Sequence, residues 1–179
     1  MSHTAEADLR YPIGKFQRPQ EISADLLNSW IDEIEALPPK LSRSLEGLSE
    51  EQLDTPYRPG GWTVRQIAHH LPDSHINSYT RYRLALTEDA PLIKPYSEAA
   101  WAELPDAKKA PVRPSIELLE CLHKRWTMLL RSMSPEQFTR TFEHPENGTV
   151  RLDTSTGLYA WHGRHHLAHI EALRQRENW

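Results

Sequence analysis

The stretch GLYAWHGRHHLAHI, residues 157–170, repeats apolar side chains at the spacing of one helix face and places four histidines among them. Tyr159, Ile170 and Leu173 form an apolar stripe, which predicts an amphipathic helix over residues 154–176. Such a helix is stabilised mainly by packing its apolar face against other elements, so partner helices are expected elsewhere in the chain.

Three further segments show the same helical periodicity, and a long connection separates two of them. The segments span residues 23–47, 63–84 and 115–132. Residues 87–114 contain five prolines, which is typical of a long connection with at most a turn of helix near residues 99–104. Four amphipathic helices with one long crossover predict an all-α fold, an antiparallel four-helix bundle.

Smaller signals refine this outline. Asn147-Gly148 lies between short β-prone pieces and indicates a small two-stranded hairpin. The proline-bearing residues 1–20 are expected to form an extended N-terminal arm that packs across the surface. The expected N-cap residues of helices and short helical turns are Ser23, Ser49, Thr63 and Ser134.

Prolines are expected to distort two of the helices. Pro38 and Pro39 should break or kink the first helix, because a proline has no backbone N–H to give to the preceding turn. Pro72 should bend the second helix close to His69 and His70.

Composition limits both the size of the core and the kinds of partner. With 179 residues and 38% hydrophobic content, the chain is expected to form a single domain, residues 1–179. A formal charge of −4 offers no basic surface for nucleic acid, so no nucleic-acid partner is expected. Apolar runs are short and the first ten residues are polar, which predicts a cytoplasmic protein with no membrane partner.

The one cysteine, Cys121, cannot form an internal disulfide. It falls in the apolar pattern of Leu118, Leu119 and Leu122, so we interpret it as a small core residue. No base with suitable spacing accompanies it, and it is therefore left out of the predicted site.

Two pairs of histidines in the last helix have the spacing of metal ligands. Residues four apart lie one turn above each other, close enough for both imidazoles to reach one ion. His166 falls near the middle of the apolar stripe with His162 beside it, which favours this pair. His165 and His169 have the same spacing and remain a rival pair.

A third ligand is expected from the second helix, where the other histidines crowd. His75 lies near the middle of that helix's apolar stripe, His70 lies at its flank, and His69 points mostly to solvent. Periodicity alone leaves the choice between His70 and His75 open.

Four segments together make the chain resemble a known family, the YfiT-type proteins of the DinB-like superfamily, described as metal-dependent hydrolases. The segments are YPIGKF (11–16), DTPYRPGGWTVRQ (54–66), HHLPDSHINSY (69–79) and GLYAWHGRHHLAHI (157–170). The resemblance covers nearly the whole chain and implies one DinB-like domain, a homodimer and one zinc or nickel ion per subunit. It also implies that His70, His162 and His166 are the metal ligands.

A metal held by three neutral imidazoles keeps an open position for water, whose pKa can fall to about 7. This chemistry predicts an enzyme that hydrolyses a small-molecule substrate. The candidates for a general acid or base are Asp73, His75 and His169. No glutamate stands between His162 and His166, so the His-Glu-x-x-His motif of zinc proteases is absent.

Two alternatives remain open. An open metal site can also activate a thiol, and relatives in the wider superfamily use low-molecular-weight thiols such as bacillithiol, so the chain could be a thiol S-transferase. Arg65, Arg81 and Arg164 are the candidates for binding a carboxylated thiol. A non-enzymatic protein with a structural metal is the other alternative, although structural zinc usually has four protein ligands.

Overall fold

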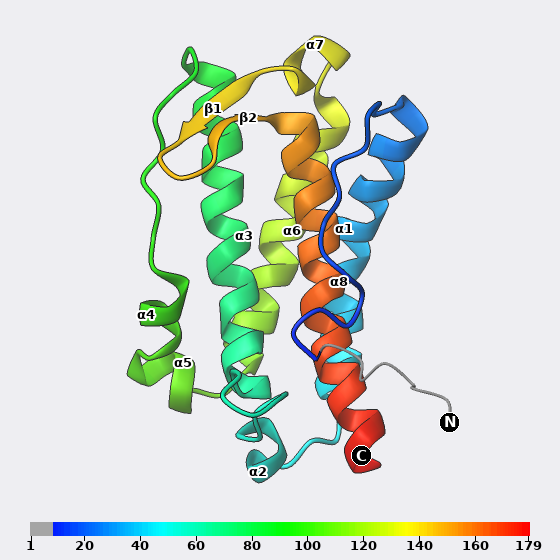
Figure 1. The fold of residues 1–179 in the computed structure, drawn as a ribbon, viewed down its shortest axis with the longest axis vertical. Helices are drawn as coiled ribbons and strands as arrows, with labels where there is room; N and C mark the ends of the chain where they lie inside the picture. The colour runs from blue at the N-terminus through cyan, green and yellow to red at the C-terminus, as the bar shows by residue number, and fades with distance from the viewer. Residues whose placement is uncertain (1–8) are drawn as a thin grey trace, which may run out of the picture.

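The computed structural model describes residues 9–179, which fold around four long helices (Figure 1). These helices are α1 (Ala24–Leu45), α3 (Val64–Thr87), α6 (Arg113–Ser132) and α8 (Leu152–Glu177). Both α1 and α3 pack against α6 and α8, so the four helices enclose a common core. The predicted all-α four-helix bundle is confirmed.

The connection between α3 and α6 determines the direction of the helices. It runs back along the flank of α3 and carries two short helices, α4 (Glu98–Ala102) and α5 (Pro105–Lys109) (Figure 1). As a result α3 and α6 run in one direction, whereas α1 and α8 run in the other. The long crossover is confirmed, and it holds one more helical turn, α5, than the sequence predicted.

Capping residues begin the helices where the sequence placed them. The Ser23 side chain accepts a hydrogen bond from the backbone N–H of Leu26, and Thr63 forms a reciprocal capping box with Gln66 at the start of α3. Ser49 and Ser134 form the same box at α2 (Glu50–Leu53) and α7 (Pro135–Phe138).

The predicted hairpin closes one end of the bundle, beside α7 (Figure 1). Strands β1 (Thr141–His144) and β2 (Gly148–Arg151) pair antiparallel, with His144 opposite Gly148. Gly148 has φ of 68°, a left-handed conformation that glycine adopts without steric cost.

The expected break at Pro38 and Pro39 is wrong, since α1 continues through both residues. The carbonyl of Ile34, four residues before Pro38, accepts a hydrogen bond from the His123 side chain instead of a helical N–H. The helix α3 also continues through Pro72.

Three predictions of burial are wrong. Cys121 is exposed and Leu118 is 45% exposed, because the buried face of α6 is formed by Leu119, Leu122 and Trp126. His69 is buried, since α5 and the start of α6 cover the side of α3 that was expected to face solvent.

None of the helices within residues 9–179 combines the length and the apolar character needed to span a membrane.

The described part of the N-terminal arm, residues 9–20, lies over α8, and residues 1–8 lie outside the described structure. Trp161 Nε1 donates a hydrogen bond to the Gly14 carbonyl at 3.2 Å, and His169 Nε2 lies 3.2 Å from the Arg10 carbonyl. The arm therefore covers the outer side of the helix that carries the histidine cluster.

Candidate metal centre

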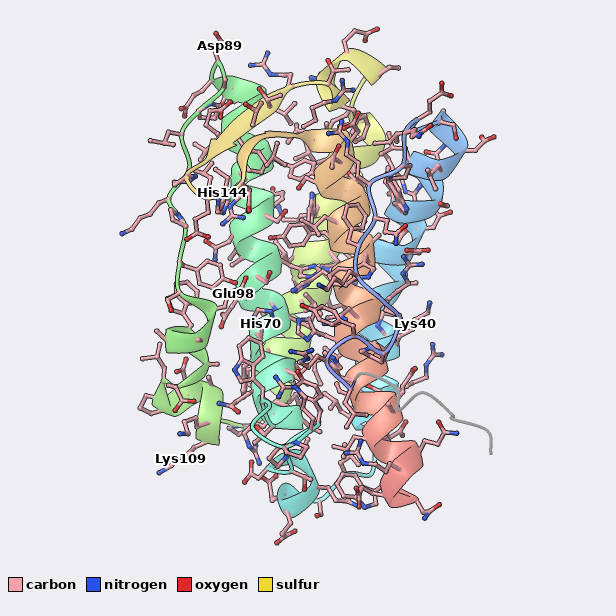
Figure 2. The ribbon with its side chains drawn as sticks, in the orientation of Figure 1. Lys40, His70, Asp89, Glu98, Lys109 and His144 are labelled. Atoms are coloured by element: carbon pink, nitrogen blue, oxygen red, sulfur yellow. The ribbon has the colours of Figure 1, made fainter. Side chains whose placement is uncertain are left out.

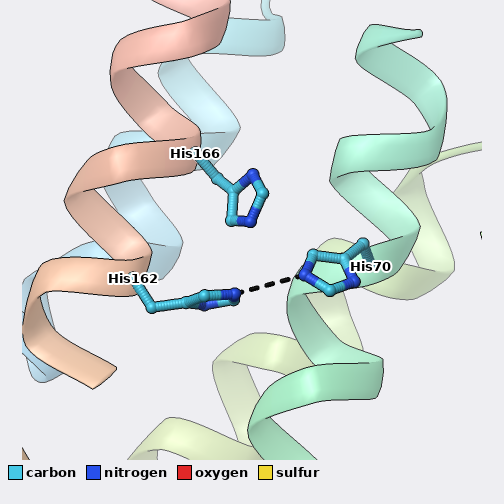
Figure 3. A group of neighbouring side chains, drawn as sticks. All are labelled: His70, His162 and His166. Atoms are coloured by element: carbon cyan, nitrogen blue, oxygen red, sulfur yellow. Dashed lines mark hydrogen bonds between the residues drawn. The ribbon is translucent and has the colours of Figure 1, made fainter. Parts of the chain in front are cut away.

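Three imidazoles converge between α3 and α8, as Figure 3 shows. His70 comes from α3, whereas His162 and His166 come from successive turns of α8. Each offers one nitrogen, and the three nitrogens lie within 4.8 Å of one another. Among the described residues, this is the only group of three or more histidine, cysteine or acidic side chains with such spacing.

The distances in this cluster suit a single ion. His70 Nε2 and His162 Nε2 lie 3.2 Å apart (Figure 3). Two imidazole nitrogens bound to one tetrahedral zinc at its usual bond length would be separated by about 3.3 Å. This pair of nitrogens therefore already has the spacing that a shared ion requires.

Burial keeps these imidazoles uncharged. It lowers the pKa of His70 to about 4, with the nearby His165 adding to the effect. Burial, followed by the neighbouring histidines, also lowers the pKa of His162 and His166 well below the usual value. Neutral imidazoles have free lone pairs and are the form that binds metals.

Trp62, just before α3, covers one side of the cluster. Its indole ring lies 4.7 Å from the His70 ring and 6.2 Å from the His166 ring, measured between centroids. We predict that this ring limits the access of water to the three nitrogens.

A chain of imidazoles extends from the cluster into the core. His162 Nδ1 lies 3.1 Å from His75 Nε2, and His75 Nδ1 lies 2.8 Å from His123 Nε2. His123 Nδ1 then donates to the Ile34 carbonyl. Both ring nitrogens of His75 are thus engaged by other histidines, and its side chain is fully buried.

The remaining histidines on α3 and α8 make their hydrogen bonds and stacked ring contacts outside the group of three. His69 Nδ1 lies 2.7 Å from Ser115 Oγ and its Nε2 lies 3.2 Å from the Ala110 carbonyl, so it connects α3 to the following segments. His165 stacks on Trp161, and His169 stacks on Tyr57 at 4.0 Å between centroids. The rival pair His165 and His169 therefore faces the arm and the loop before α3.

Asp73, the carboxylate among the acid and base candidates, is half-buried on α3. Burial, and then the charge of Asp106, raises its pKa to about 6. A carboxyl group with this pKa exchanges a proton near neutral pH, as a general acid or base must. Its charge in turn contributes to raising the pKa of Tyr96 on the crossover, so Asp73 lies on the side of α3 that faces that connection.

The cluster separates two cavities. His162 lines a cavity of about 530 Å³ between α3, the crossover, the hairpin and α8, where Glu98 and His144 are found (Figure 2). His166 lines a smaller cavity of about 210 Å³ together with Trp62 and His169. The larger cavity has the size of a small-molecule site.

Of the three arginines singled out in the sequence, only Arg81 lines the larger cavity. It makes no hydrogen bond or ion pair with any of residues 9–179. Arg65 is buried in ion pairs with Glu50 and Asp54, and Arg164 pairs with Glu33 on the outer surface.

Sequence reasoning missed His123. It lies four residues after Leu119 and three before Trp126, on the buried face of α6. A histidine in the apolar stripe of a helix was the signal that could have identified it, because a buried imidazole requires hydrogen-bond partners.

Three imidazoles that converge from two facing helices are an arrangement with which helical bundles can build metal sites. The sequence profile of the DinB superfamily matches residues 33–170, so the chain belongs to the DinB superfamily.

Comparisons with individual proteins agree. Proteins named "Putative metal-dependent hydrolase" from Bacillus cereus (strain 03BB102) and Bacillus thuringiensis subsp. konkukian (strain 97-27) are each 57% identical, over 96% of this chain and 99% of theirs. The structure of YfiT from Bacillus subtilis, described as a probable metal-dependent hydrolase, superposes with a TM-score of 0.93 at 49% identity, over 96% and 98% of the two chains. TT2238, a four-helix bundle protein, shares 18% identity and a TM-score of 0.55 over 82% and 98%, which shows the common fold alone.

Proposed function

We propose that this chain is a metal-dependent hydrolase whose ion, zinc or nickel at one per subunit, is held by His70, His162 and His166. The observation that carries the proposal is the convergence of their three nitrogens within 4.8 Å, with two of them 3.2 Å apart. The names of the close relatives support the same activity.

When bound by three neutral imidazoles with one position open, zinc or nickel would supply a water molecule with a pKa near 7 as nucleophile. The protein's part is to hold the imidazoles neutral, orient them and keep bulk water away. Burial keeps the imidazoles neutral, Trp62 lies against the His70 ring, and the N-terminal arm covers the outer side of α8.

The three candidates for acid or base catalysis have different surroundings. His75 is engaged at both nitrogens by His123 and His162, so we assign it a positioning role. His169 Nε2 is directed to the Arg10 carbonyl. Asp73 has a pKa raised to about 6, which suits proton transfer near neutral pH, but it lines neither of the two cavities beside the cluster.

The substrate is proposed to be a small molecule bound in the cavity that His162 lines. A volume of about 530 Å³ matches small-molecule ligands better than a folded protein or a nucleic acid. The absence of a glutamate between His162 and His166 separates the site from the zinc proteases.

The test is hydrolysis of a panel of aryl esters, lactones and amides by protein stripped with a chelator and reloaded with zinc or nickel. We expect turnover only in the reloaded protein, its loss in His162→Ala, and its retention in His69→Gln, a buried histidine outside the cluster. Equal rates in stripped and reloaded protein would overturn the proposal.

A second candidate, a metal-dependent thiol S-transferase, is favoured by one observation. Arg81 lines the cavity and makes no hydrogen bond or ion pair with residues 9–179, although its charge acts on the Glu98 carboxylate of the same cavity, and a carboxylate on a thiol such as bacillithiol would pair with it. Metal-dependent transfer of a carboxylated thiol to an alkyl halide, with a raised KM in Arg81→Gln, would favour this activity over hydrolysis. Zinc or nickel as the native metal, the homodimer and the cytoplasmic location stay predictions.

A further inference from the structure

We infer that a directed chain of hydrogen bonds, Ile34 carbonyl to His123 to His75 to His162, fixes the orientation and the proton position of the metal-binding imidazole of His162. It rests on the proposed metal site and assigns His75 and His123 as positioning residues. This hydrogen-bonded chain includes one group from each long helix of the bundle: α1, α6, α3 and α8.

The direction of the chain follows from its end. A carbonyl oxygen can only accept, so His123 Nδ1–H must donate to Ile34. A neutral imidazole has one N–H, so His123 Nε2 carries a lone pair and accepts from His75 Nδ1–H, 2.8 Å away.

The direction of the hydrogen bonds is the same between His75 and His162, at the metal site. With its Nδ1 protonated, His75 offers a lone pair at Nε2, which accepts from His162 Nδ1–H at 3.1 Å. His162 Nε2 is then left with a free lone pair, and it is this nitrogen that faces His70 Nε2 at 3.2 Å. A single carbonyl on the far side of the core therefore selects the metal-binding tautomer of His162.

Pro38 explains why this carbonyl is available. In an α-helix the N–H of residue 38 would donate to the carbonyl of residue 34, but proline has no N–H. Pro38 is buried, whereas the adjacent Pro39 is exposed. The proline that was expected to break the helix instead leaves the Ile34 carbonyl free for His123.

The surroundings of His75 and His123 offer no competing hydrogen-bond partner among the described residues. His75 is fully buried and His123 is 1% exposed, and the ring of Trp126 lies edge-on to both. Trp126 Nε1 makes no hydrogen bond within the described residues and supplies no acceptor. The geometry therefore allows one arrangement of protons when all three imidazoles are neutral.

The first test needs no substitution and no metal. Long-range ¹H–¹⁵N spectra of the metal-free wild type should show His123, His75 and His162 all protonated at Nδ1. Free neutral histidine favours protonation at Nε2, so this pattern would not arise by default. Protonation of His162 or His75 at Nε2 would overturn the inference.

The second test measures affinity for zinc alone by competition with a chelator. His75→Phe and His123→Phe keep a ring but lose the hydrogen bonds, and we expect each to weaken zinc binding about 10–100-fold. His123→Gln can still donate to Ile34 and accept from His75, so it should bind zinc nearly as tightly as the wild type. His69→Phe is the matched control, because His69 is a buried histidine of α3 outside the hydrogen-bonded chain. This variant should bind zinc as tightly as the wild type.

Pro38→Ala adds an N–H that competes for the Ile34 carbonyl and should weaken zinc binding, whereas Pro39→Ala should not. If His75→Phe and His123→Phe both bind zinc as tightly as the wild type, the inference fails while the proposed metal site stands. If the wild type binds no zinc or nickel, the proposed function fails, and the positioning role fails with it.

Discussion

Gly163 lies directly against Leu37, since a β-carbon placed on Gly163 would be only 2.6 Å from Leu37 Cδ2. The glycine sits between the two proposed ligands of α8 and lets this helix approach α1 closely. We predict that Gly163→Ala destabilises the metal-free protein by about 1–3 kcal/mol, because the added methyl group must displace buried side chains. Urea unfolding followed by circular dichroism measures this change.

A double-mutant cycle tests the cause. If the methyl group at position 163 clashes with Leu37, then Leu37→Ala should relieve part of the cost, and the double variant should be more stable than the sum of the two single effects. Simple additivity of the two changes would show that the close approach is not the source of the loss.

Much of the fold follows from local signals in the sequence. N-caps at Ser23 and Thr63 and the Asn147-Gly148 turn act within a few residues, so they predicted where elements begin. Helix periodicity likewise predicted that His162 and His166 share one face of α8, because both lie on the same element.

Contacts between distant segments could not be predicted in this way. Periodicity did not show that His69 would be covered by α5, or that the Ile34 carbonyl would be satisfied by a residue 89 positions away. The choice between His70 and His75 required the relative rotation of α3 and α8, which depends on packing. Only resemblance to a family favoured His70.

Stability should depend strongly on pH between about 4 and 6.5. Every histidine in residues 9–179 has a lowered pKa, and for His70, His123 and His169 burial lowers it to about 4. In this range the unfolded chain binds protons that the native state does not, so stability is present above pH 6.5 and lost as pH falls. Each group contributes up to about 1.4 kcal/mol per pH unit.

Asp73, with its pKa raised to about 6, has the opposite effect on stability as the pH falls, but it is a single group. Acid titration of the metal-free protein, followed by circular dichroism, should therefore show cooperative unfolding within this range. Added zinc should move the midpoint to lower pH, because protons and metal compete for the same nitrogens. A midpoint that zinc does not shift would argue against these histidines as ligands.

The buried guanidinium of Arg65 predicts an asymmetry between the partners of its two ion pairs, with Glu50 and Asp54. The Arg65 side chain is 3% exposed, while those of Glu50 and Asp54 are 79% and 56% exposed. Arg65→Met leaves only hydrated carboxylates, whereas Glu50→Gln combined with Asp54→Asn leaves a buried charge with little compensation. We expect the double variant to lose about 3 kcal/mol in urea unfolding and Arg65→Met clearly less. Equal losses would contradict the burial of the guanidinium.

Trp62 offers an optical signal for the metal site. Its ring lies 4.7 Å from His70, so Ni²⁺ bound at the cluster should quench its fluorescence. Trp62→Phe should remove most of the nickel-dependent change, whereas Trp101→Phe, on the outer crossover, should leave it intact. Unchanged quenching in Trp62→Phe would place the ion elsewhere.

Whether His70, His162 and His166 hold the ion is tested by the metal content per chain of untagged protein, measured by elemental analysis after zinc or nickel loading and removal of excess ion. We expect one ion per chain in the wild type, almost none in His166→Ala, and one in His169→Ala, which removes a histidine of the rival pair on the same helix. An ion retained by His166→Ala but lost from His169→Ala, or no stoichiometric ion in the wild type, would contradict this assignment of the ligands.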